Sequence, residues 1–276
     1  MLRWATFLSP VLYDTYASIT QYVGERLGVP TTLHVGQSLN EFTSGEADVG
    51  FLCGLLYAKM SQPRPIELLA APVVMGKRYQ GKPLYYSDVI VRRDSPYTSF
   101  DALEGTRWAF NEEASHSGYN IVSYSLLMRG KTLASFGSLL KTGSHFASLQ
   151  AVLAGKADAA AIDSHVLDAW FQQKPELAQH LRVVEMLGPS TIPPIVASTH
   201  IDASTRRHIQ EILCTMHNDS NGAKSLHAGF IERLVPIVDE QYDDIRHMTA
   251  CVQDIRKGLI HYTLEPHHRP NEGVMN

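Results

Sequence analysis

Two short segments rich in hydroxyl residues have the chemistry to bind an anion. The first is Ser115-His116-Ser117-Gly118, which follows the strand-like residues 107–110 and precedes a helical stretch. At a helix start the first backbone N–H groups have no partner within the helix, and the helix dipole is positive. Together with serine hydroxyls and an imidazole, such a start can hold an oxyanion. The alternative is that Ser115 or Ser117 only caps the helix.

The second segment, Thr142-Gly143-Ser144-His145, precedes another helical stretch and repeats the same design. A single histidine of this kind is usually a surface or capping residue. Two such helix starts in one run of alternating elements nevertheless strengthen each other, because ligands of open α/β sheets bind outside the carboxyl ends of the strands.

An acidic residue and two aromatic residues complete the candidate binding residues. Asp163 follows the strand-like residues 157–162 and either caps the next helix or accepts a hydrogen bond at the mouth of a cleft. Tyr85 leads into the apolar residues 86–91, and Tyr57 belongs to the same class. Aromatic residues in such places are usually core residues, but a phenol can also donate its O–H to an anion while its ring walls the pocket.

No catalytic motif accompanies these residues. The sequence contains no GxSxG, HExxH or P-loop motif, and no GxGxxG after a strand. The three cysteines, Cys53, Cys214 and Cys251, fit neither a metal motif nor a closed set of disulfides. We interpret them as buried free thiols. The sequence therefore predicts a protein that is not an enzyme and that uses no metal and no cofactor.

Composition limits the class of protein. The 276 residues, of which 44% are hydrophobic and 19% charged, are enough for two lobes of a soluble protein. The formal charge of −4 argues against nucleic-acid binding but is compatible with a locally positive pocket for a small anion. No apolar run approaches the ~20 residues of a membrane span. The first residues, MLRWATFLSP, lack the pattern of a signal peptide, which indicates a cytoplasmic protein or a mature exported form.

The elements that must position the candidate residues alternate between strands and helices. Residues 11–27 have apolar residues at helical spacing, and short apolar runs indicate strands between helices. The predicted strands are 2–8, 31–35, 47–53, 66–74, 86–91, 107–110, 157–162, 181–186 and 195–198. This alternation predicts an α/β fold with mainly parallel sheets. Residues 203–258 are predicted to be mostly helical, and the polar segment after Tyr262 to be poorly ordered.

Four segments together resemble the phosphate/phosphite/phosphonate ABC-transporter substrate-binding proteins, the family of the phosphonate-binding protein. They are DVGFLCGLLYA, YYSDVIVRRDSPYTSFDALEG, WAFNEEASHSGYNIVSYSLL and GSHFASLQAVLAGKADAAAIDS. The likeness runs from about Leu2 to Ser198, and less specifically to about Gly258. It implies a type II periplasmic-binding fold, in which two α/β lobes enclose a ligand cleft.

The resemblance also implies where the lobes divide and which residues form the pocket. The chain is expected to cross between the lobes near 86–93 and 191–197. Lobe one is then 1–90 plus 196–276, including the C-terminal helices, and lobe two is 91–195. The oxyanion pocket of the family would use Ser115, His116, Ser117 and His145, with Tyr57 and Tyr85 as walls.

Two departures from the family pattern bear on the ligand. Many members have Ser-Thr-Ser-Gly where this chain has Ser-His-Ser-Gly. Members that hold an aminoalkyl phosphonate place carboxylates opposite the ammonium group. The matching positions here carry His165 and Ile192-Pro193-Pro194, and Asp163 is the nearest acidic residue. We therefore expect a small oxyanion without a cationic tail.

The expected function is the capture of a phosphate-, phosphite- or phosphonate-like oxyanion for an ABC importer, by a periplasmic and monomeric protein. Its partner would be an ABC permease or a membrane sensor. Two alternatives stay open, because a fold alone does not fix a function. One is a cytoplasmic or signalling sensor with the same fold, and the other is an enzyme acting on a phosphorylated small molecule.

Overall fold

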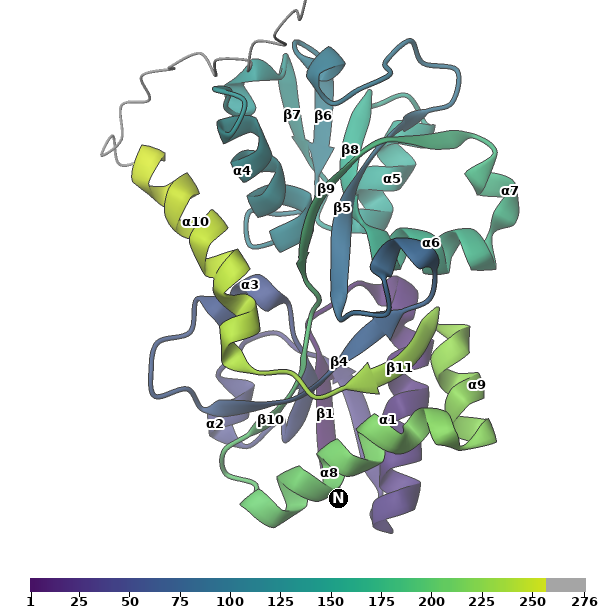
Figure 1. Ribbon diagram of the computed structural model, residues 1–276, viewed down its shortest axis with the longest axis vertical. Helices are drawn as coiled ribbons and strands as arrows, with labels where there is room; N and C mark the ends of the chain where they lie inside the picture. Colours follow the sequence, from purple (N-terminus) through teal and green to yellow (C-terminus); the bar gives the residue numbers. More distant parts are fainter. Residues whose placement is uncertain (257–276) are drawn as a thin grey trace, which may run out of the picture.

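The computed structural model describes residues 1–256 as two α/β lobes, each built on its own sheet (Figure 1). Lobe one contains β1 (Leu2–Thr6), β2 (Thr31–Val35), β3 (Val49–Phe51), β4 (Ile66–Val74), β10 (Ile195–Ser198) and β11 (Ile231–Val235). Lobe two contains β5 (Leu84–Arg92), β6 (Arg107–Phe110), β7 (Ser138–Lys141), β8 (Ala159–Asp163) and β9 (Leu181–Thr191). Each predicted strand segment overlaps one of these strands.

Two strands were not predicted. The residues of β7 are all exposed, so its sequence carries no signal of burial. The strand β11 lies in the region that was predicted to be mostly helical. Its first residue is buried and its second residue is exposed. It pairs with β4 in the sheet of lobe one. The two strands are far apart in the sequence, so a local pattern does not reveal this pairing.

Helices flank both sheets (Figure 1). Those of lobe one are α1 (Tyr13–Leu27), α2 (Glu41–Ser44), α3 (Gly54–Ala58), α8 (Ala203–Thr215) and α9 (Ser220–Ala228). Those of lobe two are α4 (Ile121–Leu127), α5 (His145–Leu153), α6 (Ser164–Gln173) and α7 (Pro175–Ala178). Within residues 1–256, no helix combines the length and the apolar character that a membrane span requires.

Both sheets are mixed, whereas the sequence predicted mainly parallel sheets. The strand orders are β11-β4-β10-β3-β1-β2 and β7-β6-β8-β5-β9. Parallel pairing joins β1 to β2 and β3, and β6 to β7 and β8. The strands next to the crossings, β5, β9 and β10, run antiparallel to their neighbours. The reason is topological, because a chain that returns from the other lobe enters its sheet from the opposite end.

The chain passes between the sheets at residues 75–83 and again at 192–194. The first passage comes before β5, whereas the sequence placed it at 86–93. Residues 84–92 pair with β8 and β9 and therefore belong to lobe two, together with Tyr85. An apolar run identifies a strand, but it does not say which sheet the strand joins.

An ion-pair cluster anchors the first passage to lobe two. Arg78, in the short helix η2 (Lys77–Tyr79), donates to the carboxylates of Asp88 at 2.8 Å and Asp168 at 2.7 Å. Asp88 is fully buried, and burial raises its pKa to about 6 even though the Arg78 charge acts in the opposite direction. These ion pairs therefore hold the first passage against lobe two, in addition to the backbone connection between the passage and β5.

The C-terminal helix α10 (Asp243–Arg256) connects the lobes a third time (Figure 1). It contacts α3 in lobe one and both α4 and β9 in lobe two. The Asn120 amide donates to Thr249 Oγ1 at 3.2 Å, which fixes the helix to lobe two. The sequence placed the C-terminal helices in lobe one, and α10 contacts both lobes. The segment after Tyr262, predicted to be poorly ordered, lies outside the described residues.

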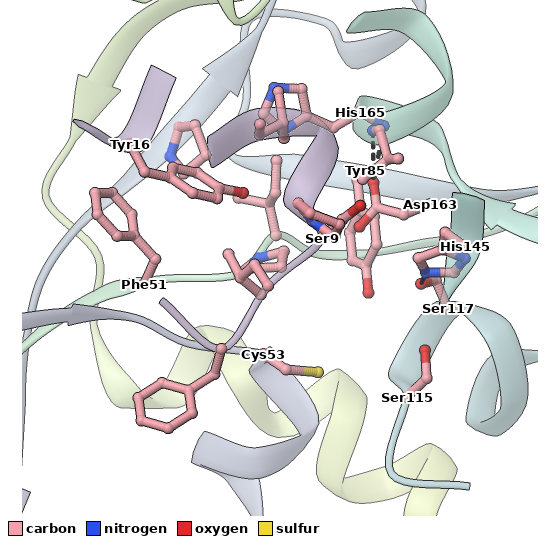
Figure 2. Close-up of a pocket in the computed structure, with 18 of the residues that line it drawn as sticks. Ser9, Tyr16, Phe51, Cys53, Tyr85, Ser115, Ser117, His145, Asp163 and His165 are labelled. Carbon is pink, nitrogen blue, oxygen red and sulfur yellow. Dashed lines mark hydrogen bonds between the residues drawn. The ribbon is translucent and has the colours of Figure 1, made fainter. Parts of the chain in front are cut away.

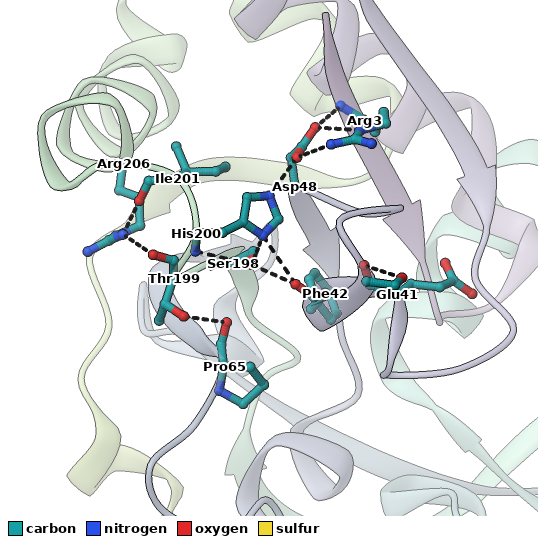
Figure 3. Close-up of polar contacts among 11 residues, drawn as sticks. Arg3, Glu41, Phe42, Asp48, Pro65, Ser198, Thr199, His200, Ile201 and Arg206 are labelled. Carbon is teal, nitrogen blue, oxygen red and sulfur yellow. Dashed lines mark hydrogen bonds and ion pairs between the residues drawn. The ribbon is translucent and has the colours of Figure 1, made fainter.

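At the amino end of β3, Asp48 holds three strands of lobe one together (Figure 3). Its buried carboxylate accepts from the Arg3 backbone N–H at 2.7 Å and from the Arg3 guanidinium at 2.8 Å. The His200 Nε2 lies 2.9 Å from Asp48 Oδ1. Burial acts to raise the pKa of Asp48, but the hydrogen bonds from Arg3 and His200 outweigh it and hold this pKa below its ordinary value.

Replacing Asp48 by Ala is expected to lower the free energy of unfolding by about 2–3 kcal/mol, because Arg3 loses its charged partner. The exposed Asp94, which pairs with Arg92, provides the control, and Asp94→Ala should leave stability almost unchanged. Urea denaturation at pH 7 measures both. Because the folded pKa of Asp48 is depressed, its contribution should be present above about pH 4 and decline as the pH falls further. Equal losses from the two substitutions would contradict this role.

Candidate ligand-binding site

A cavity of about 170 Å³ lies between the two lobes. Most of its lining comes from segments at or after the carboxyl ends of five strands, namely β1, β3, β6, β7 and β8. In α/β proteins this edge of a sheet is the usual place of ligands, and the sequence analysis placed the site there. The polar lining is concentrated in lobe two, whereas lobe one contributes mainly apolar side chains.

Six of the nine predicted site residues line this cavity, and three do not. Figure 2 shows several of the six around the open space. The lining residues are Tyr85, Ser115, Ser117, Ser144, His145 and Asp163. The residues outside the lining are Tyr57, His116 and Gly118.

Both predicted helix starts face the cavity, and both begin with a capping serine. Ser115 Oγ accepts the N–H of Gly118 at 3.0 Å and caps the short helix η4 (His116–Asn120), which leads into α4. Ser144 Oγ accepts the N–H of Ala147 at 3.1 Å and caps α5. The capping alternative and the pocket alternative are therefore compatible, because a hydroxyl that accepts one hydrogen bond keeps its own proton for another.

Ser117 and His145 join the two helix starts. Ser117 Oγ lies 2.9 Å from His145 Nε2. Burial lowers the pKa of His145 to about 4, although the Ala161 carbonyl acts in the opposite direction, so the ring is neutral at neutral pH. A neutral ring carries a single N–H, so an Nδ1–H that donates to the Ala161 carbonyl leaves Nε2 to accept the Ser117 proton. In the other tautomer Nε2–H donates to Ser117, and the serine proton can then reach a ligand oxygen.

Asp163 caps α6 and faces the same cavity. Its Oδ1 accepts the N–H groups of His165 at 2.9 Å and Val166 at 3.2 Å. Burial raises its pKa to about 7, and these two backbone hydrogen bonds oppose the shift without cancelling it. Near neutral pH the carboxyl group therefore exists in both protonation states, so it can donate a hydrogen bond to a ligand oxygen or accept one.

His116 does not line the cavity, contrary to the prediction from the Ser-His-Ser-Gly segment. Its side chain is fully buried, with Nε2 2.7 Å from Ser190 Oγ and Nδ1 3.1 Å from the Asn120 amide. Burial lowers its pKa to about 3. Ser190 in turn donates to Asp244 of α10 at 2.9 Å. His116 thus connects the binding turn to β9 and α10, because neighbouring side chains of a tight turn point to opposite sides.

The other two residues outside the lining have structural positions. A Cβ atom on Gly118 would lie 1.9 Å from Asn111 Oδ1, so only glycine lets Asn111 approach the turn. Tyr57 donates its hydroxyl to Asp239 at 2.7 Å, and its ring lies 4.9 Å from the Tyr242 ring. Tyr57 thus packs against the segment that precedes α10.

Several lining residues were missed by the sequence analysis, among them Tyr16, Cys53 and Asn111. Cys53 and Asn111 come just after β3 and β6, so the rule that placed the serines at the carboxyl ends of strands could have found them. Tyr16 lies in the first turns of α1, and only the packing of α1 against the sheet brings it to the cavity. Burial raises the pKa of the Cys53 thiol, as expected for an unreactive cysteine.

The cavity offers dipoles rather than positive charges. Among residues 1–256, neither Arg nor Lys contributes to its lining. Within the same residues, no group of three His, Cys, Asp or Glu side chains is arranged to hold a metal ion. An anion in this cavity would be bound by hydroxyl groups and by the N–H groups of helix starts.

The fold and the cavity define a two-lobed binding protein of the type II periplasmic class. Residues 4–242 match the family described as "ABC transporter, phosphonate, periplasmic substrate-binding protein". The chain therefore belongs to this family of transport proteins, as the resemblance of the four sequence segments implied. No curated protein matches the chain by sequence.

Solved structures with low sequence identity share the fold. A binding protein component of an ABC phosphonate transporter from Pseudomonas aeruginosa is 15% identical, with a TM-score of 0.81 over 96% of this chain and 90% of that chain. PhnD1 from Prochlorococcus marinus, in complex with methylphosphonate, is 17% identical, with a TM-score of 0.78 over 94% and 98%. The periplasmic aliphatic sulphonate binding protein SsuA from Escherichia coli is 14% identical, with a TM-score of 0.61 over 100% and 96%.

Replacing Asp163 by Asn is expected to stabilise the ligand-free protein at pH 8, on the order of 2 kcal/mol, because a buried carboxylate is removed while asparagine still caps α6. The raised pKa of Asp163 means that the cost of its charge grows as the pH rises toward about 7, so the gain should vanish near pH 4. Asp202 caps α8 and has a depressed pKa, so Asp202→Asn should have the opposite sign. Thermal unfolding at several pH values measures both. A gain that does not depend on pH would contradict the assignment.

Proposed function

We propose that the protein captures a small phosphonate- or phosphite-like oxyanion in the cavity between its lobes and presents it to an ABC permease. One observation carries this proposal: the two serine-capped helix starts at Ser115 and Ser144 come from separate segments and face the same cavity. Family membership supports the class of ligand, and the methylphosphonate complex of the Prochlorococcus marinus relative supports its head group.

The proposed binding mode uses neutral donors. Ser115, Ser117 and Ser144 direct hydroxyl protons to the ligand oxygens, while His145 orients Ser117 through the bond at 2.9 Å. Asp163, with its pKa near 7, favours a ligand that carries one proton, because a singly charged anion is repelled less and can share that proton. Enclosure between the lobes excludes water and strengthens each of these hydrogen bonds.

The other details of the proposal follow from the same arrangement. The lobes divide at the passages 75–83 and 192–194, and α10 spans them. The family works in the periplasm with an ABC permease, and we propose the same location and partner for this chain. We also propose that it acts as a monomer, since one chain supplies both walls of the cavity.

A Ser–His–Asp arrangement in lobe one does not support an enzyme. Ser198 Oγ lies 2.6 Å from His200 Nδ1, and His200 Nε2 lies 2.9 Å from Asp48 (Figure 3). Ser198, however, is 1% exposed and donates its hydroxyl to the Phe42 carbonyl at 2.8 Å. A nucleophile must reach its substrate, so we propose that this cluster is structural and that the protein turns over no substrate.

Loss of either partner in the Ser117–His145 pair should weaken binding. We expect Ser117→Ala and His145→Ala each to lower the affinity for methylphosphonate by about 10- to 100-fold, the effect of one hydrogen bond to a charged group. Ser138→Ala, at an exposed position of β7, is the matched control and should bind like the unmodified protein. Isothermal titration calorimetry measures all four proteins, and unchanged affinity in both site variants would refute the proposed site.

A turnover assay tests the absence of catalysis. Incubation with phosphate monoesters, and with methylphosphonate as the expected ligand, should release no inorganic phosphate above the level of a buffer control. The structural reason is the inaccessible hydroxyl of Ser198. Release of phosphate that disappears in the Ser198→Ala variant would overturn this part of the proposal.

A further inference from the structure

The cavity has two ends of different chemistry. At one end lie the serines of lobe two together with His145, and Figure 2 shows Tyr16 and Phe51 on the opposite side. This second end extends into lobe one, toward α1, β3, β4 and β11. Its lining is apolar and includes Leu12, Ile19, Phe51, Pro72, Ile231 and Leu234.

Tyr16 lies on the apolar side and points its hydroxyl toward the middle of the cavity (Figure 2). Its ring stacks on Phe51 with centroids 4.4 Å apart, and the residue is only 5% exposed. No hydrogen bond from residues 1–256 contributes to the shift of its pKa, which burial raises and the charge of Asp163 raises further. Because Tyr16 lines the cavity and its hydroxyl faces the open space, this group is placed to contact a bound molecule.

The part of lobe one that lines the apolar end contributes no acidic side chain for a cationic tail. The acidic residues that line the cavity, Glu112 and Asp163, both come from lobe two, and Oδ1 of Asp163 is bonded to the first turn of α6. His165 is bonded to the Gly229 carbonyl at 2.7 Å, and burial lowers its pKa. An ammonium group placed among Ile19 and Phe51 would lose its hydration, and Asp163, whose charge acts on Tyr16, is only partly ionised near neutral pH and so is a weak counter-ion.

The cavity is also larger than a bare oxyanion requires. An apolar cavity of about 150 Å³ in another protein holds a benzene molecule, so a cavity of 170 Å³ has room for a small organic molecule. A tetrahedral oxyanion held by the serines and His145 accounts for part of this volume. The remainder adjoins the apolar lining, where hydrocarbon is the favoured content.

We infer that the ligand is an organophosphonate whose phosphorus carries an uncharged hydrocarbon substituent larger than methyl. The phosphonate group lies at the end formed by Ser115, Ser144 and His145. The substituent passes Tyr16 and fills the apolar end beside Ile19 and Phe51. This inference rests on the proposed function and specifies the substrate class of the same site.

Calorimetric titration with methyl-, ethyl-, propyl- and butylphosphonate tests the inference. Each added methylene should tighten binding by about fourfold until the apolar end is full. Propylphosphonate should bind about tenfold or more tightly than 2-aminoethylphosphonate, which has the same chain length but ends in an ammonium group. Affinity that stays flat or falls beyond methyl, or a preference for the amine, would overturn the inference and leave the proposed function intact. If phosphite binds and none of these compounds does, the inference alone fails, and if neither phosphite nor any of these compounds binds, the proposed function fails as well.

Variants that fill the apolar end provide a second test. Ile19→Phe and Ile231→Phe should each weaken propylphosphonate binding by about tenfold, because the added ring volume takes the place of the substituent. Methylphosphonate binding by the same variants should change much less. Ile212→Phe, on α8 and outside the cavity lining, is the control for the substitution itself. The ratio of the two affinities within each variant is independent of the fraction of folded protein. An equal loss for both ligands would overturn the inference.

Discussion

An anion that is enclosed between two protein lobes loses its hydration, and fixed dipoles must replace the lost water. In this protein neither Arg nor Lys of residues 1–256 lines the cavity, so hydroxyl groups and helix starts have to supply those dipoles. This requirement explains why capping serines face the cavity from two separate segments. Burial keeps His145 neutral and raises the pKa of Asp163 to about 7, so neither side chain is a permanent charge in the cavity. The strong ion pairs, such as Arg78 with Asp88, are used away from the cavity to hold the chain passages.

The sequence allowed much of this site to be predicted, because helix starts and strand ends have local signatures. Serine followed by a helical stretch identified Ser115 and Ser144, and a strand of small residues identified Asp163. The direction of a side chain within a tight turn has no such signature. His116 therefore looked equivalent to its neighbours, although it faces Ser190 and Asn120 instead of the cavity.

Features that depend on distant parts of the chain were the hardest to predict. Tyr16 reaches the cavity only because α1 packs against the sheet of lobe one. Assigning β5 to a lobe requires its pairing with β8 and β9, and β11 forms only because it meets the edge strand β4. The same limitation applies to α10, whose amphipathic pattern is satisfied by two lobes instead of one. Local patterns thus predicted the polar half of the site better than the apolar half.

The path of α10 has a mechanical consequence. Two chain passages alone, at 75–83 and 192–194, would act like a pair of hinges and leave the lobes free to bend and to twist. A third connection, displaced from the line between those hinges, removes one of these freedoms. Any rotation of one lobe relative to the other must then change either the contact of α10 with α3 in lobe one, or its contact with α4 and the hydrogen bonds from His116 through Ser190 to Asp244 in lobe two. The binding turn and the outer surface of α10 are therefore parts of one linkage, and a displacement at one end has to be taken up at the other.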